Sequence, residues 1–160
     1  MVNQLIQKHG YGFIQLLVMY SSTVSNRLTS FRLLGDHRCP IVDTWWQTET
    51  GGVMISPIAH AWNLEPGSAT LPFFGIQTQL FDKKTRQPLE TPNIGELCIT
   101  DSWPGQARTL FRNHERFIDV YFKPYPGYYF TGDGCEIKEN DYHRITGRVV
   151  CREYFILMRI

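Results

Sequence analysis

Residues 43–52 place side chains that can bind a nucleotide and a metal ion in one short run, Asp-Thr-Trp-Trp-Gln-Thr-Glu-Thr-Gly-Gly. The hydroxyls of Thr48 and Thr50 can donate hydrogen bonds to phosphate oxygens, and the carboxylate of Glu49 is an oxygen ligand of the kind that binds Mg²⁺. The two glycines that end the run permit a tight turn and a close approach of the backbone to a ligand. The structural alternative is a buried tryptophan pair at the end of a strand, and the residues alone leave both interpretations open.

Two further motifs follow along the chain. Residues 129–134 are Tyr-Phe-Thr-Gly-Asp-Gly, and residues 145–149 are Ile-Thr-Gly-Arg-Val. Together with residues 43–52, they resemble the nucleotide-binding signatures of AMP-forming acetyl-CoA synthetases, which belong to the superfamily of adenylate-forming enzymes. The resemblance covers residues 38–149. Because three motifs agree with that family in order and approximate spacing, the resemblance is specific.

The resemblance implies an acetate–CoA ligase. In that reaction the carboxylate of acetate attacks the α-phosphorus of ATP, diphosphate leaves, and the thiol of CoA then attacks the acetyl-adenylate and releases AMP. The implied substrates are acetate, with propionate as the alternative, ATP and CoA, and the implied cofactor is Mg²⁺. Such an enzyme works mainly by positioning and charge stabilisation, so no residue is assigned as a catalytic acid, base or nucleophile.

The resemblance also implies roles for individual residues. The implied nucleotide-binding residues are Asp43, Thr44, Trp45, Trp46, Gln47, Thr48, Asp133 and Arg148. The residues from Asp43 to Gln47 would form one wall around the adenine. Thr48 would donate to the α-phosphate, and Glu49 would be the Mg²⁺ ligand. Trp46 would close the end of the acyl pocket, so that the site selects short acids by size.

Asp133 is expected in a tight Thr-Gly-Asp-Gly turn, where its carboxylate would accept hydrogen bonds from both ribose hydroxyls. Arg148 would contact the ribose or the neighbouring phosphate. The structural alternatives are core packing for Trp46, an ordinary β-turn residue at Asp133 and a solvated arginine at Arg148. Residues 103–105 and 113–117 also match the family, and they are expected to be a structural loop and a helix.

The composition is that of one globular domain of 160 residues, with 42% hydrophobic residues and a net charge of +1. This charge gives no electrostatic basis for binding nucleic acid or an anionic membrane. The four cysteines are too widely spaced for a zinc motif, so they are expected to be reduced, buried thiols of an intracellular protein: Cys39, Cys98, Cys135 and Cys151. No segment reaches the length of a membrane span, and the short apolar run 13–20 is expected to be a buried helix or strand.

The hydrophobic pattern predicts an α/β fragment, in which the end of a mixed sheet is followed by a small antiparallel β-barrel or sheet with one helix. The strands are expected at residues 31–34, 40–43, 76–81, 95–100, 128–133 and 135–149, with a loop over 57–74 and a hairpin turn at 140–141. The strand at 40–43 would deliver the first motif at its C-terminal end, where open α/β sheets bind ligands. Asn113 is expected to cap the helix, whose buried face would carry Phe117, Ile118, Tyr121 and Phe122.

The departures from the family divide the chain into a divergent segment 1–37, a partial AMP-binding domain 38–149 and a divergent apolar tail 150–160. The run Gly35–Arg38 leads almost directly to Cys39, where the family has a Gly-Glu-Pro element. We therefore expect a truncated ligase that is inactive alone. The alternative is a non-catalytic isoform that binds AMP or ATP weakly or associates with the full-length synthetase. The expected compartment is the mitochondrial matrix or the cytosol.

Overall fold

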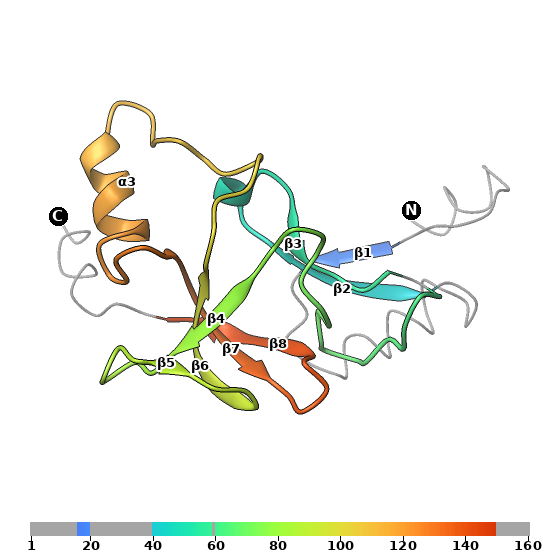
Figure 1. Ribbon diagram of the computed structural model, residues 1–160. Helices are drawn as coiled ribbons and strands as arrows, with labels where there is room; N and C mark the ends of the chain where they lie inside the picture. Colours follow the sequence, from blue (N-terminus) through green and yellow to red (C-terminus); the bar gives the residue numbers. More distant parts are fainter. Residues whose placement is uncertain (1–15, 20–39, 59, 150–160) are drawn as a thin grey trace, which may run out of the picture.

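The computed structural model describes residues 16–19, 40–58 and 60–149, and in these ranges it contains two β-sheets and one α-helix (Figure 1). The first sheet is mixed and has the order β1-β2-β3: β1 (Leu16–Met19), β2 (Ile41–Trp46) and β3 (Val53–Ile55). Strand β1 runs parallel to β2, and β3 runs antiparallel to it. The expected mixed sheet is confirmed, and the apolar run 13–20 contributes a strand. The strand expected at 31–34 lies outside the described residues.

Strand β2 carries the first motif and is buried from Ile41 to Trp45, as is typical of a strand covered on both faces. Its pairing with β3 shifts between Trp45, which pairs with Ile55, and Trp46, which pairs with Val53. Such a bulge re-aims the side chains that follow it. The end of β2 therefore turns one tryptophan out of the core.

The second sheet is antiparallel and has the order β5-β4-β6-β7-β8. Its strands are β4 (Thr78–Phe81), β5 (Pro88–Leu89), β6 (Asn93–Ile99), β7 (Tyr129–Ile137) and β8 (His143–Arg148). Strands β5 and β8 are its two edges and do not pair with each other, so the sheet is open and is not a barrel. The predicted hairpin turn is confirmed, because Asp141 lies between β7 and β8 with φ 61° and its N–H donates to the carbonyl of Lys138.

The prediction of a turn at Thr-Gly-Asp-Gly, between two separate strands, is wrong. Strand β7 runs continuously through all four residues. Its partner β6 places Cys98 opposite Phe130 and Glu96 opposite Gly134, so residues 131–133 bulge opposite a single residue of β6. Gly132 permits this bulge because it adopts φ 71°. The motif therefore bends within the sheet and never leaves it.

Helix α3 (His114–Tyr121) begins as predicted at Asn113, whose Oδ1 accepts a hydrogen bond from the backbone N–H of Arg116 at 3.1 Å. Phe117 is buried, and Tyr121 packs against the main core. The prediction of burial is wrong for Ile118, which is 42% exposed. Phe117 and Tyr121 are four positions apart and therefore lie on the same side of the helix, which packs inward. Ile118 lies beside that side.

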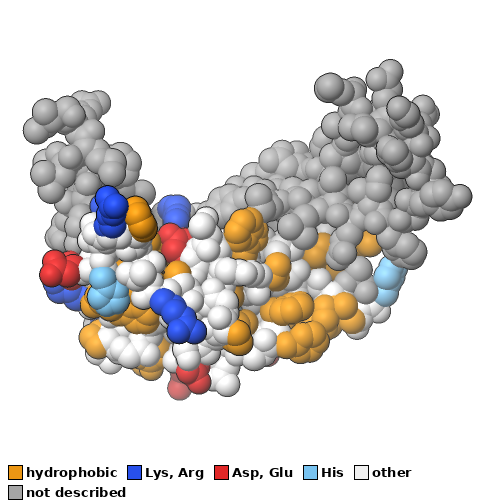
Figure 2. Space-filling model, turned by 90° about the horizontal axis from the view of Figure 1, so that it is seen from above, with side chains coloured by type: hydrophobic (Ala, Val, Ile, Leu, Met, Phe, Trp, Pro, Cys, Tyr) orange, Lys and Arg blue, Asp and Glu red, His pale blue; other side chains and the backbone are white. Residues whose placement is uncertain are grey.

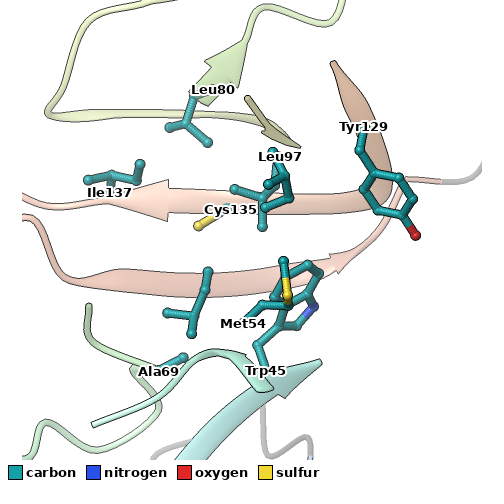
Figure 3. Close-up of a cluster of buried hydrophobic side chains, with 10 residues drawn as sticks. Trp45, Met54, Ala69, Leu80, Leu97, Tyr129, Cys135 and Ile137 are labelled. Atoms are coloured by element: carbon teal, nitrogen blue, oxygen red, sulfur yellow. The ribbon is translucent and has the colours of Figure 1, made fainter. Parts of the chain in front are cut away.

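The main hydrophobic core joins the two sheets (Figure 3). Its buried members come from β2, β3, the loop 57–74 and three strands of the larger sheet, β4, β6 and β7: Trp45, Met54, Ile55, Ala69, Leu80, Leu97, Ile99, Tyr129, Cys135 and Ile137. Cys98 and Cys135 are buried free thiols, as expected, whereas Cys39 and Cys151 lie outside the described residues. The shared core fixes β2 relative to β7, and these strands carry two of the three motifs.

The surface carries no concentrated charge on the face that Figure 2 presents, where basic and acidic side chains are interspersed. In the described part of the chain, no helix is both long and apolar enough to cross a membrane. Within the same residues, no three His, Cys, Asp or Glu side chains gather into a group that could hold a metal ion by themselves.

Candidate functional site

A pocket of about 460 Å³ opens beside the end of β2. Its lining comes from all three sequence motifs: Thr44, Trp45, Trp46, Gln47, Thr48, Glu49, Asp133 and Arg148. The structure thus brings together the residues that the sequence predicts for nucleotide or metal binding, with the exceptions of Asp43 and Thr50. The carboxylate of Asp43 is buried and accepts a hydrogen bond from the backbone N–H of Gly67 at 2.9 Å. Asp43 therefore anchors the loop 57–74 and does not line this pocket.

The pocket floor is the 3₁₀ turn η1 (Thr48–Thr50), which follows β2 directly. Gln47 caps the turn: its N–H donates to Oγ1 of Thr50 at 3.0 Å, and that hydroxyl lies 2.8 Å from the carbonyl of Gln47. The expectation that Thr50 donates to a phosphate is wrong, because its side chain is fully buried and bound to the backbone. Thr48 is exposed and lines the pocket, so its hydroxyl is the one accessible to a ligand.

A second loop supports η1 from outside the pocket. Nε1 of Trp103 donates to the carbonyl of Thr50 at 2.7 Å, and the N–H of Ala107 donates to the carbonyl of Glu49 at 2.8 Å. Gly51 ends the turn with φ 67°, and a Cβ at this position would lie 2.2 Å from the carbonyl oxygen of Gly105. The loop expected at residues 103–105 therefore has a structural role, which is to fix the backbone that carries Glu49.

The two tryptophans of the first motif have different environments. Trp45 is 2% exposed and belongs to the main core, whereas Trp46 is 38% exposed and forms part of the pocket wall. The shift in pairing between them accounts for this difference. Trp45 is thus a core residue that also lines the pocket, and Trp46 is a partly exposed residue of the pocket wall.

Asp133 is the centre of the buried polar contacts. Its Oδ2 accepts hydrogen bonds from Nε1 of Trp45 at 3.1 Å and from Nε2 of Gln47 at 2.9 Å. Its Oδ1 is buried and accepts no hydrogen bond from the described residues, but it lies 3.5 Å from Nη1 of Arg148. Burial raises the pKa of this carboxyl, while the charge of Arg148 and the two hydrogen bonds oppose the rise. One acceptor oxygen of Asp133 thus has no hydrogen-bond donor among the described residues.

Arg148 lies opposite Asp133 in the pairing of β7 with β8. Its Nη1 also donates to the carbonyl of Thr131 at 2.9 Å, which fixes the guanidinium against the bulge of β7. The side chain is 64% exposed and lines the pocket. The arginine can therefore neutralise Asp133 and contact an anionic ligand at the same time.

The arrangement agrees with a comparison against protein families, in which the family described as AMP-binding enzyme matches residues 2–107. The chain belongs to this family. The match includes most of the segment 1–37 that the sequence analysis expects to be divergent, and the domain boundaries at residues 38 and 149 stay predictions.

Among proteins with assigned names, this AMP-binding family member is similar to acetyl-coenzyme A synthetases of bacteria. It is 60% identical to those of Methylocella silvestris and Xanthomonas campestris over 119 residues. It is 59% identical to that of Bdellovibrio bacteriovorus over 117 residues. These alignments cover 73–74% of the chain and 18% of each relative. The chain thus spans about a fifth of the length of the curated relatives that it matches.

Two tyrosines beside the pocket of this family member have no role that the sequence predicts. The hydroxyl of Tyr121 donates to Oε1 of Glu49 at 2.5 Å, and the hydroxyl of Tyr129 donates to Oε1 of Gln47 at 3.0 Å. Burial and the neighbouring Glu49 raise the pKa of Tyr121 to about 12, so that its hydroxyl keeps its proton at neutral pH. The helical pattern identified Tyr121 as a core residue, but no local pattern indicates the partner of its hydroxyl.

Proposed function

We propose that the chain provides the adenylate-binding region of an AMP-forming acetate–CoA ligase. The reaction of the whole enzyme would convert ATP, acetate and CoA to acetyl-CoA, AMP and diphosphate through acetyl-adenylate. The observation that carries the proposal is the single pocket in which three distant motifs meet: the residues 44–49, Asp133 and Arg148. The names of the similar bacterial proteins support the choice of acetate over other acids.

In this proposal the residues of the pocket bind and orient the nucleotide. The buried Oδ1 of Asp133 accepts a ribose hydroxyl, and Arg148 contacts the ribose or a neighbouring phosphate. Thr48 donates to the α-phosphate from the exposed floor of the pocket. The ring of Trp46 limits the length of the acyl group, which leaves acetate and, as the alternative, propionate as substrates.

The donor set of the pocket fits Mg²⁺ that arrives with ATP. Mg²⁺ commonly binds through one or two carboxylates together with substrate phosphates, and Glu49 supplies one carboxylate at the pocket. The ion would neutralise charge that develops on the phosphates. Glu49 would hold it, while Thr48 and Arg148 hold the nucleotide.

We further propose that these residues by themselves bind nucleotide without turnover, since the aligned region is 18% of each relative's length. Association with a full-length synthetase would supply the remaining groups. The proposed compartment is the mitochondrial matrix or the cytosol. Fractionation of cells that contain the protein would test the compartment.

The deciding experiment is a thermal shift with AMP. AMP that binds the folded chain raises its melting temperature, and Asp133→Ala should abolish the rise. The matched control is Asp101→Ala, which removes an exposed aspartate that does not line the pocket. Acetate-dependent exchange of ATP with diphosphate measures catalysis separately. A melting temperature that AMP does not change would refute the proposed function.

A further inference from the structure

The pocket contains a contact that nucleotide binding does not explain, between helix α3 and the turn η1. Tyr121 is the last residue of α3, and its hydroxyl donates to Oε1 of Glu49 at 2.5 Å. The two residues are 72 positions apart in the chain. A hydrogen bond of 2.5 Å between a helix end and a pocket carboxylate requires both side chains to be held in place.

Both partners are held. The ring of Tyr121 stacks on the ring of Tyr129 with a centroid separation of 5.3 Å and an interplanar angle of 3°. Figure 3 shows Tyr129 at the end of the core cluster, with its oxygen pointing away from the cluster. That oxygen donates to Oε1 of Gln47 at 3.0 Å. Two parallel tyrosines thus donate to Gln47 and Glu49, which flank the exposed Thr48.

The backbone of Glu49 is fixed independently of its side chain. Its carbonyl accepts from the N–H of Ala107, and the next carbonyl accepts from Nε1 of Trp103. The only freedom left to Glu49 is the rotation of its side chain, and the hydroxyl of Tyr121 restricts that rotation by holding Oε1. A carboxylate has two oxygens, so Oε2 can still bind a cation when Oε1 is held.

We propose that Tyr121 is a positioning residue that fixes the carboxylate of Glu49 for the metal ion of a bound nucleotide. This inference rests on the proposed function, because it assigns Glu49 to the metal. A hydrogen bond to a ligating carboxylate typically strengthens metal binding by a factor of about 10 to 100. Tyr121 does not contact the nucleotide in this proposal, so it should affect only binding that involves the metal.

The test compares three binding constants of the full chain: AMP without metal, ATP without metal, and ATP with MgCl₂. Tyr121→Phe keeps the stacked ring and removes only the hydroxyl. We expect it to weaken ATP binding in MgCl₂ by about tenfold and to leave AMP binding unchanged. The matched control is Tyr125→Phe, which removes a tyrosine hydroxyl that donates at 2.5 Å to another carboxylate, Glu96, away from the pocket.

A double-mutant cycle with Glu49→Gln distinguishes positioning from a general loss of stability. If Tyr121 acts through Glu49, Tyr121→Phe should have no further effect on the MgCl₂ dependence in the Glu49→Gln background. An unchanged MgCl₂ dependence in Tyr121→Phe, or equal effects in both backgrounds, overturns this inference while AMP binding still supports the proposed function. Failure of the unsubstituted chain to bind AMP overturns both.

Discussion

The indole Nε1 of Trp45 donates a hydrogen bond to Oδ2 of Asp133 at 3.1 Å, which joins two sequence motifs that lie 88 positions apart. Trp45 is a core residue, so the carboxylate at the pocket is held by the hydrophobic core itself. Gln47 donates to the same oxygen, and the other carboxylate oxygen lies 3.5 Å from Nη1 of Arg148. The stability of the fold and the geometry of the pocket are therefore coupled at Asp133.

Trp45→Phe should reduce both stability and AMP affinity. The substitution keeps an aromatic ring in the core but removes the donor to a buried carboxylate, and the loss of a hydrogen bond to a charged group costs about 1.5–3 kcal/mol. The free energy of unfolding in urea and the Kd for AMP measure the two effects. Trp62→Phe is the control, because Nε1 of Trp62 donates at 3.1 Å to the neutral hydroxyl of Thr70. Equal losses in the two variants would contradict the coupling.

The stability that depends on Asp133 should fall as pH rises. Burial raises the pKa of this carboxyl in the folded chain above its ordinary value of 3.8. Between pH 3.8 and the raised pKa, the folded state therefore binds more protons than the unfolded state. The free energy of unfolding of the unsubstituted chain, minus that of Asp133→Asn, should therefore decrease from about pH 4 upward. It should level off above the raised pKa.

Asp82 provides a control of opposite sign for that pH dependence. Its carboxylate accepts hydrogen bonds from the backbone N–H groups of Thr85 and Lys84, which lower its pKa. The free energy of unfolding of the unsubstituted chain, minus that of Asp82→Asn, should be constant above the pKa of this carboxyl in the unfolded chain. It should decrease as the pH falls from there through the lowered pKa of the folded chain. Urea unfolding at a series of pH values measures both variants. The same sign for both would show that the environment of Asp133 is not the one described.

The sequence contains enough information to place Asp133 beside Arg148. The hairpin turn at Asn140–Asp141 lies midway between them, so antiparallel pairing brings the two residues opposite each other, as the structure shows. The end of β2 is likewise predictable from its apolar run and the glycines after it. These features depend on residues that are close in the chain.

Other features of the site could not be predicted, because they depend on packing between distant segments. The partner of the Tyr121 hydroxyl and the support that Trp103 gives to η1 have no local signature. The bulge in β7 was mistaken for a turn, because a glycine permits positive φ in either setting. The hydrogen bond from the N–H of Gly67 to Asp43 likewise joins residues 24 positions apart and has no local signature.

Gly51→Ala should destabilise the turn that carries Glu49, whereas Gly52→Ala should be tolerated. A side chain at position 51 would occupy a left-handed conformation, which costs about 1–2 kcal/mol, and its Cβ would overlap the carbonyl of Gly105. A Cβ at Gly52 meets no atom within 4 Å. Urea unfolding and the thermal shift with AMP compare the adjacent variants. Tolerance of alanine at position 51 would contradict the close contact of the two loops.

Trp46→Gly should lengthen the acyl groups that the pocket accepts. The ring of Trp46 forms part of the pocket wall, and its removal leaves space that a longer alkyl chain can fill. Each methylene that becomes buried contributes about 0.8 kcal/mol, or about a fourfold gain in affinity. Alkyl esters of AMP, from ethyl to hexyl, are stable probes of this dependence and can be titrated into the chain. Phe74→Gly is the control, since it removes a large exposed ring that does not line the pocket. If the affinity of Trp46→Gly does not rise with alkyl length, the ring at position 46 does not limit the size of the acyl group.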